Sequence, residues 1–180
     1  HKFYGPKGVG VLYIGQDVDR KELAAIIHGG GQEGGLRSGT LNVPGIVGLG
    51  KASALCMDIE KEASALELLR DHLEEELLKI DGAVINGAPH SRLPNTCNIS
   101  FFGVEAAMVM EALSREFAIA TGSACNTELS SPSYVLKAMG FSDKRIQGSL
   151  RISVGRYNSL EEVDHFCARL RAVINELKNC

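Results

Sequence analysis

The chain has 180 residues, of which 44% are hydrophobic and 20 are glycine, so it is long enough to bury the core of one or one-and-a-half domains. Its 19 Lys and Arg residues face 22 Asp and Glu residues, a net charge of −3, which provides no basic surplus for nucleic acid. No apolar run reaches the length that a membrane span needs. We therefore expect a globular protein that binds neither nucleic acid nor membranes.

The five cysteines are scattered along the chain and form no CxxC pair; they are Cys56, Cys97, Cys125, Cys167 and Cys180. An odd, dispersed set is not typical of a disulfide scaffold or of a zinc site and favours a reducing compartment. With no export leader visible, we expect a cytoplasmic protein. Because the chain begins without Met inside a glycine-rich stretch, we expect it to be the carboxy-terminal part of a longer protein.

Residues 1–44 are rich in glycine and in turn-forming residues. Within them Val9–Ile14 is a continuous apolar run with β-branched residues, which predicts a buried strand. His28–Gly35 contains too many glycines for a regular element. Two interpretations of that second stretch stay open: a flexible surface loop, or a loop that brings its backbone close to a ligand.

From Pro44 to Lys79 the pattern is helical, because four leucines recur at three- and four-residue steps: Leu66, Leu69, Leu73 and Leu77. Beyond Asp81, strand patterns and helix patterns alternate along the chain. Strands are predicted at residues 83–86, 96–102, 119–121 and 150–154, and helices at 104–117, at 132–139 before Gly140, and after the capping residue Ser159. The order β-β-α-β-α-β-α predicts an α+β sandwich.

Lys2 and Cys125 are the first two candidates for chemistry. Lys2 stands next to a glycine-containing turn and could be a Schiff-base amine if it is desolvated; otherwise it is a solvated surface residue. Cys125 follows Gly, Ser and Ala and precedes a polar stretch, which favours an exposed thiol and thiolate chemistry. The patterns around Cys56, Cys97 and Cys167 favour buried structural cysteines instead.

Arg151 and Arg156 flank an apolar strand. An arginine keeps its charge when it is buried and must therefore find an anion. A substrate carboxylate held by two parallel hydrogen bonds would serve, and so would an internal Asp or Glu. The sequence leaves both partners open.

Seven stretches together resemble the cysteine desulfurases of the class-V aminotransferase group, which are pyridoxal-phosphate (PLP) enzymes of fold type I. They are residues 1–10, 28–33, 37–40, 94–95, 120–125, 132–136 and 151–156. They occur in the family's order and with family-like spacing over essentially the whole chain, which is far more specific than any single motif. The length of the segment between Cys125 and Pro132 resembles the long-loop branch, the housekeeping and nitrogen-fixation type.

The resemblance implies an α/β protein in three parts. Residues 1–44 would be the carboxy-terminal end of the large PLP-binding domain, residues 45–80 a linking helix, and residues 81–180 the small α+β domain. The family's ring-stacking histidine, the aspartate at the pyridine nitrogen and most of the phosphate cup precede the position of His1. We therefore expect the 180 residues alone to lack catalytic power.

The resemblance also implies roles at the cofactor. Lys2 is similar to the lysine that links covalently to PLP, and His1 to the histidine before it, which contacts the cofactor phosphate. Thr40 is similar to the threonine that reaches the phosphate of the neighbouring subunit's cofactor. A homodimer is expected for that reason.

At the substrate, Cys125 resembles the nucleophile that takes sulfur from L-cysteine, carries it as a persulfide and leaves alanine. Arg151 resembles the arginine that clamps the substrate carboxylate, and Asn95 a residue that orients the substrate. No metal ligand is implied.

The implied function is an L-cysteine desulfurase that passes sulfur to an acceptor protein such as an iron–sulfur scaffold. A selenocysteine lyase shares most of these motifs and stays open. So does a non-catalytic small-domain module that docks sulfur acceptors. A plain aminotransferase is disfavoured because Cys125 would have no task.

Overall fold

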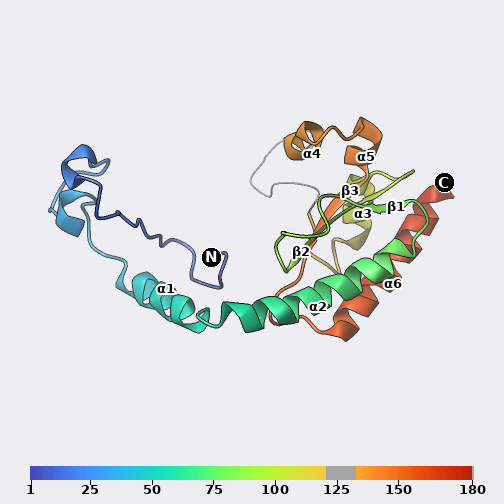
Figure 1. Cartoon of the computed structure of the whole chain (residues 1–180), viewed down its shortest axis with the longest axis horizontal. Coiled ribbons are helices and arrows are strands. Elements are labelled where there is room, and N and C mark those ends of the chain that lie inside the picture. The colour runs from blue at the N-terminus through green and yellow to red at the C-terminus, as the bar shows by residue number, and fades with distance from the viewer. Residues whose placement is uncertain (121–132, 180) are drawn as a thin grey trace. The chain divides into compact units, whose positions relative to one another are not determined.

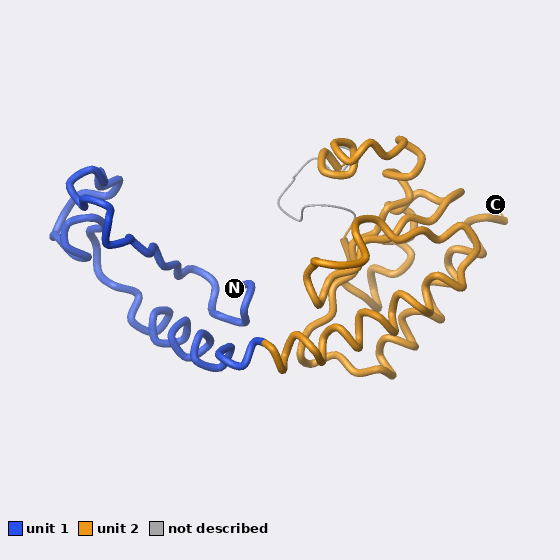
Figure 2. The backbone as a smooth tube through the Cα atoms, in the orientation of Figure 1, with its two compact units in different colours: residues 1–59 blue, residues 60–180 orange. Residues whose placement is uncertain are grey.

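The computed structural model describes residues 1–120 and 133–179 and divides into two compact units, His1–Ile59 and Glu60–Cys180 (Figure 2). Among the described residues, no helix is both long and apolar enough to cross a membrane. The three-part division into residues 1–44, 45–80 and 81–180 stays a prediction.

The first unit contains one regular helix, α1 (Val43–Leu55), and two short 3₁₀ turns, Arg20–Glu22 and Glu33–Gly35. Asn42 caps α1, since its Oδ1 accepts a hydrogen bond from the Gly45 N–H at 3.1 Å. Pro44 lies in the first turn of α1, as predicted from its fixed φ and missing N–H.

The strand predicted at Val9–Ile14 is wrong for this chain. The segment has no regular secondary structure, and Val11, Leu12 and Tyr13 are 88%, 76% and 85% exposed. A strand needs a neighbour to satisfy its backbone groups, and within the described residues no other strand pairs with this segment.

The second unit holds the remaining elements (Figure 1). In chain order they are α2 (Ile59–Leu78, which starts at the last residue of the first unit), β1 (Ala83–Ile85), β2 (Thr96–Phe101), α3 (Ala106–Leu113), α4 (Tyr134–Ala138), α5 (Asp143–Gln147), β3 (Ser149–Ser153) and α6 (Leu160–Lys178). The helical stretch predicted from Pro44 to Lys79 is therefore two helices, α1 and α2, separated by residues 56–58.

The three strands form an antiparallel sheet in the order β1-β2-β3. Side chains alternate between its faces. One face is buried and apolar, with Cys97, Ile99 and Phe101 from β2 and Leu150 and Ile152 from β3. We call this the apolar face.

Three helices complete the core with the apolar face: α2, α3 and α6. Helices α2 and α6 lie side by side, joined by a contact of 2.6 Å between His72 Nε2 and Asp164 Oδ1 (Figure 1). The buried helix side chains are Leu66, Leu73 and Leu77 on α2, Ala106, Val109 and Leu113 on α3, and Val163, Phe166, Cys167, Leu170, Val173 and Ile174 on α6. The leucine spacing of α2 is thus confirmed as its buried stripe, with Leu69 partly buried beside it.

Two predicted helix ends are confirmed. Ser159 caps α6 in a capping box with Glu162, because each side chain bonds the other residue's backbone N–H. Gly140 has φ +80° after α4, and the N–H groups of Gly140 and Phe141 donate to the carbonyls of Lys137 and Leu136. This is the arrangement that favours glycine after a helix.

Two other predictions differ from the structure. The predicted strand 119–121 shows only an isolated bridge at Ala120, and residue 121 lies outside the described residues. Helix α5 was not predicted, because a five-residue helix is too short to show an apolar period.

Candidate functional site

The second face of the sheet is polar, which is unusual for a surface that packs against other elements. It carries Thr96, Asn98 and Ser100 from β2, Ser149, Arg151 and Ser153 from β3, and Asn86 just after β1. We call this the polar face. Asn86, Ser100 and Ser149 on it are buried. Buried polar groups are normally satisfied by hydrogen bonds, so their partners define how this face is built.

Arg151 lies on the polar face directly opposite Asn98. Its backbone N–H donates to the Ala120 carbonyl at 2.6 Å, and its carbonyl accepts from the Ala120 N–H at 3.2 Å. Because both backbone groups face Ala120, the pair Asn98–Arg151 is a non-hydrogen-bonded pair, the type whose side chains lie closer together. Among the described residues, no carboxylate lies within ion-pair distance of Arg151, which is half-buried.

Arg156 has an internal acid as its partner, whereas no described residue supplies one to Arg151. Its Nε and Nη2 donate to the two carboxylate oxygens of Glu62 at 3.0 and 2.6 Å. This bidentate pair ties the segment after β3 to α2. The sequence left open whether these arginines bind a substrate carboxylate or an internal acid. For Arg156 the structure shows an internal acid, Glu62.

Asn95 lies at the start of β2, one residue before the polar face. Its carbonyl accepts from the Val154 N–H at 2.9 Å, and its Oδ1 accepts from the Thr96 hydroxyl at 3.3 Å. Asn95 is half-buried and joins the ends of β2 and β3.

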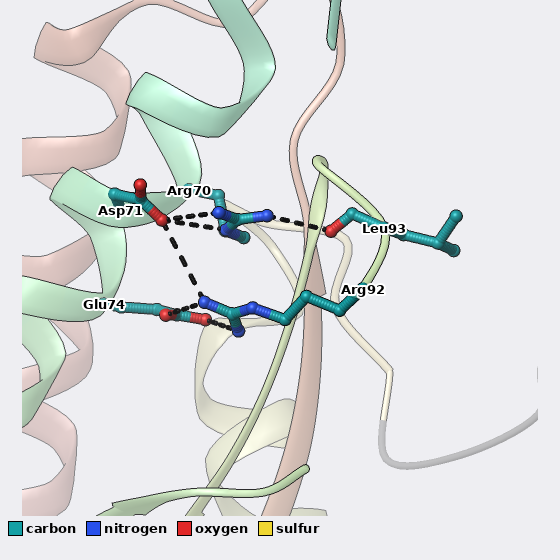
Figure 3. A network of polar contacts seen from close by, with 5 residues as sticks. All are labelled: Arg70, Asp71, Glu74, Arg92 and Leu93. Carbon is teal, nitrogen blue, oxygen red and sulfur yellow. Dashed lines mark hydrogen bonds and ion pairs between the residues drawn. The ribbon is translucent and has the colours of Figure 1, made fainter. Parts of the chain in front are cut away.

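A network of charged side chains fixes the segment that leads to Asn95 (Figure 3). Arg92 donates from Nη1 and Nη2 to the two carboxylate oxygens of Glu74 at 2.6 and 2.5 Å, and the pair raises the pKa of Arg92. Arg70 bonds Asp71 and donates from Nη1 to the Leu93 carbonyl at 3.0 Å. The approach to β2 is thus held to α2 at two consecutive residues, Arg92 and Leu93.

The cysteines divide by environment. Cys97 and Cys167 are buried, as predicted, and burial is the main reason that the pKa of both thiols is raised, that of Cys167 to about 12. Cys56 is only half-buried, so the prediction of a buried residue is wrong for it. Its Sγ contacts the Phe3 carbonyl at 3.6 Å. Cys125 lies outside the described residues.

His1 and Lys2 are exposed at the beginning of the first unit. Thr40 is exposed at the end of residues 28–40, which we call the glycine-rich loop, and the N-terminus and this loop lie at opposite ends of the first unit (Figure 1). The structure therefore does not bring Thr40 together with the His1–Lys2 pair of the same chain.

Side-chain hydrogen bonds hold the glycine-rich loop in shape. Gln32 Oε1 accepts from the Gly39 N–H at 2.9 Å, and Arg37 Nη1 donates to the carbonyls of Gly39 and Thr40 at 3.0 and 3.2 Å. Gly39 has φ +104°, which non-glycine residues rarely adopt. Thr40 is thus presented at a defined point on an exposed loop.

The donor set of the first unit fits a phosphorylated aldehyde such as PLP. Lys2 provides a primary amine for an aldehyde, and the His1 imidazole and the Thr40 hydroxyl are donors that suit a phosphate. All three side chains are exposed and open to a ligand.

A hollow of about 500 Å³ lies elsewhere in the second unit, lined by Phe117, Ile119, Val154, Glu116 and Glu162 among others. Hydrogen bonds from Arg169 to Glu116, and from Asn158 and Ser159 to Glu162, lower the pKa of both carboxyls. Glu116 is ion-paired with Arg169 at 2.8 Å, so of these two carboxylates only Glu162 adds a negative charge that no cation among the described residues compensates.

The Aminotransferase class-V family profile matches residues 1–166. The chain belongs to the class-V aminotransferase family. It is 44% identical over 179 residues to the cysteine desulfurase IscS of Actinobacillus succinogenes and 43% identical over 179 residues to that of Pasteurella multocida. Both alignments cover 99% of this chain and 44% of the relative. The chain thus spans less than half the length of these class-V relatives.

Solved structures agree with this family. A NifS-like protein superimposes with a TM-score of 0.84 at 38% identity, covering 97% of this chain and 44% of that one. SspA in complex with cysteine superimposes with a TM-score of 0.61 at 37% identity, covering 88% and 43%. The family and the fold class expected from the seven stretches are confirmed.

The sequence motifs did not single out the polar residues that share a face of the sheet with Arg151, namely Asn86, Asn98, Ser100 and Ser149. A signal was present in β2, where Asn98 and Ser100 alternate with Cys97, Ile99 and Phe101. This alternation places a polar row on one face of a strand that is otherwise buried.

Proposed function

We propose that this chain forms the substrate-binding and sulfur-accepting part of a PLP-dependent L-cysteine desulfurase. The observation that carries the proposal is the half-buried Arg151 on the polar face, which has no carboxylate partner in the described part of the chain. A guanidinium in that state suits a substrate carboxylate. Arg151 is bridged through its backbone to Ala120, and Cys125 follows Ala120 by five residues in the sequence.

In the proposed reaction, L-cysteine and the Cys125 thiol become L-alanine and a Cys125 persulfide. The C–S bond of the substrate breaks, an S–S bond to Cys125 forms, and the substrate carbon gains a proton, so no external oxidant or reductant is needed. PLP, when bound, supplies the electron sink that makes the carbon–sulfur bond labile. In this proposal Arg151 holds the carboxylate, Asn95 orients the substrate, and the Lys2 amine moves protons.

A homodimer with shared cofactor sites is part of this proposal. The separation of Thr40 from His1 and Lys2 within the first unit supports it, because one chain alone does not gather the three donors. Thr40 would then serve the cofactor of the partner subunit. The persulfide would pass to a sulfur-acceptor protein, such as an iron–sulfur scaffold, in the cytoplasm.

The test is a Cys125→Ser variant in the intact, PLP-loaded protein. Because Ser cannot accept sulfur, we expect alanine and sulfide formation from L-cysteine to fall at least 100-fold, a loss typical of removing a nucleophile. Cys56→Ser is the matched control, since Cys56 is a half-buried thiol of the first unit, and it should retain activity. The same assay with selenocysteine distinguishes a selenocysteine lyase. Full activity of Cys125→Ser would contradict the proposed function.

A further inference from the structure

Three side chains form a row across the polar face, one from each strand region. The Asn86 N–H, just after β1, donates to the carbonyl of Asn98 on β2 at 2.7 Å, so the two residues are neighbours. Asn98 is in turn opposite Arg151 on β3. The row therefore runs Asn86–Asn98–Arg151. Its first two members are amides, which can present either a donor or an acceptor to a neighbour.

Arg145 on α5 fixes which way the amides point. Its Nε donates to Asn86 Oδ1 at 2.8 Å, and its Nη2 donates to the Ile85 carbonyl at 3.1 Å. A guanidinium has no acceptor, so the Asn86 oxygen must face Arg145. The guanidinium also lies 3.9 Å from the centre of the Phe141 ring, a cation–π contact that holds it in place.

The Asn86 orientation that Arg145 fixes also fixes the orientation of the Asn98 amide. With its oxygen toward Arg145, Asn86 points Nδ2 toward β2, where it donates to Asn98 Oδ1 at 2.7 Å and to Ser100 Oγ at 2.8 Å. Asn98 must therefore present its oxygen to Asn86. Its own Nδ2 is left as a donor, and no acceptor within the described residues contacts it.

The two serines close the network. Ser149 Oγ donates to the Arg145 carbonyl at 2.7 Å, and so the 2.8 Å contact between Ser100 and Ser149 has Ser100 as its donor. The hydroxyl protons of both serines are thereby assigned. Reversing Asn86 would place its amide nitrogen against a donor-only guanidinium, which would leave buried donors unsatisfied.

We propose that Asn98 is a second substrate-carboxylate ligand beside Arg151, and that Arg145 is the positioning residue that keeps the Asn98 amide nitrogen available. This inference rests on the proposed function and adds a specificity-determining residue to its site. A row of donors, one charged and one neutral, recognises an anion and disfavours a cationic or neutral group. The site would thus select the amino-acid carboxylate separately from the thiol.

The experiment measures ligand affinity instead of turnover. Binding of L-alanine, which has the carboxylate, and of cysteamine, which has the amine and thiol but no carboxylate, is measured by calorimetry on the intact PLP-loaded protein. We expect Asn98→Ala to raise the Kd of alanine about 10-fold and to leave that of cysteamine within about twofold. Asn158→Ala is the matched control, because Asn158 bonds Gly155 and Glu162 outside the row. Its alanine Kd should not change.

Arg145 is tested by a conservative and a non-conservative variant. Lysine is also a donor without an acceptor, so Arg145→Lys should retain alanine affinity. Arg145→Met frees Asn86 to reverse and should weaken alanine binding by a similar factor to Asn98→Ala. Equal alanine affinity in Arg145→Lys and Arg145→Met would overturn the positioning role.

The remaining outcomes separate this inference from the proposed function. An unchanged alanine Kd in Asn98→Ala, or equal weakening of both ligands, would overturn the inference alone. A selective loss of alanine binding in a protein that forms no alanine from cysteine would support the carboxylate site and overturn the desulfurase proposal. If the unaltered protein binds no alanine, that result contradicts both the inference and the proposed function.

Discussion

The two faces of one small sheet differ in almost every physical respect. The apolar face packs five side chains of β2 and β3 into the core with α2, α3 and α6. The polar face, built from the intervening residues of the same strands, carries Asn98, Ser100, Ser149 and Arg151. Adjacent positions such as Cys97 and Asn98 therefore belong to different chemical environments only one residue apart.

The difference shows how the fold separates stability from recognition. Burial on the apolar face contributes free energy in proportion to the area removed from water and does not depend on direction. The polar face gains little net free energy from each hydrogen bond, but every bond fixes a direction. A site for a charged substrate needs direction, and strand alternation provides it without interrupting the core.

The largest contrast should be seen in thiol reactivity. Burial raises the pKa of Cys167 from 9.0 to about 12, which lowers its thiolate fraction near pH 8 about 1,000-fold. We expect iodoacetamide to label Cys97 and Cys167 at least that much more slowly than Cys125, and the Cys167 rate still to rise at pH 10. Mass spectrometry of the labelled peptides measures this, with urea-unfolded protein as the control. Equal rates for Cys125 and Cys167 in folded protein would remove the contrast.

A core truncation on the apolar face should lower stability strongly. Phe101→Ala removes a fully buried ring and should reduce the free energy of unfolding by about 3–5 kcal/mol. Ser153→Ala, on the polar face and exposed, should change it by less than about 0.5 kcal/mol. Urea unfolding of both variants gives the comparison. A loss below about 1 kcal/mol for Phe101→Ala would mean that the core does not depend on this face.

Exchange of the two arginines for lysine should have opposite effects. Arg151→Lys loses the planar fork, and removing one partner of a charged pair costs about 2–5 kcal/mol, so kcat/KM should fall about 30-fold or more, mostly through KM. Its Tm should not change. Arg156→Lys weakens a partly exposed pair with Glu62, which is worth about 0.5–1 kcal/mol, and should lower Tm without changing KM. A lower Tm with unchanged KM in Arg151→Lys would assign Arg151 a structural role.

Much of the second unit could be predicted because its signals are local. The apolar period of α6, the cap at Ser159 and the glycine at position 140 all specify structure within a few residues. The strands β2 and β3 were found within one residue at either end because alternation and β-branched residues mark them.

The features that could not be predicted depend on partners far away in the sequence. The run Val9–Ile14 has the composition of a buried strand, but composition does not show which segment pairs with it. The polar row requires the register of three strands and the reach of Arg145, which is 59 residues from Asn86. Likewise, the residues next to Arg151 and Arg156 do not indicate which of the two has an internal acid as its partner. That acid is Glu62, which pairs with Arg156 from the distant helix α2.

The fixed direction of the Arg145–Asn86–Asn98 chain has a consequence for redesign. Converting the site to accept a positively charged group requires removing the Arg151 charge and placing an acceptor at position 98. An aspartate at position 98 would accept from Asn86 Nδ2 with one oxygen and present the other, so the bond from Arg145 to Asn86 need not change. Positions 98 and 151 are direct neighbours on β2 and β3, so their effects on ligand charge preference are coupled, and libraries that vary one position at a time will not reach the reversed site.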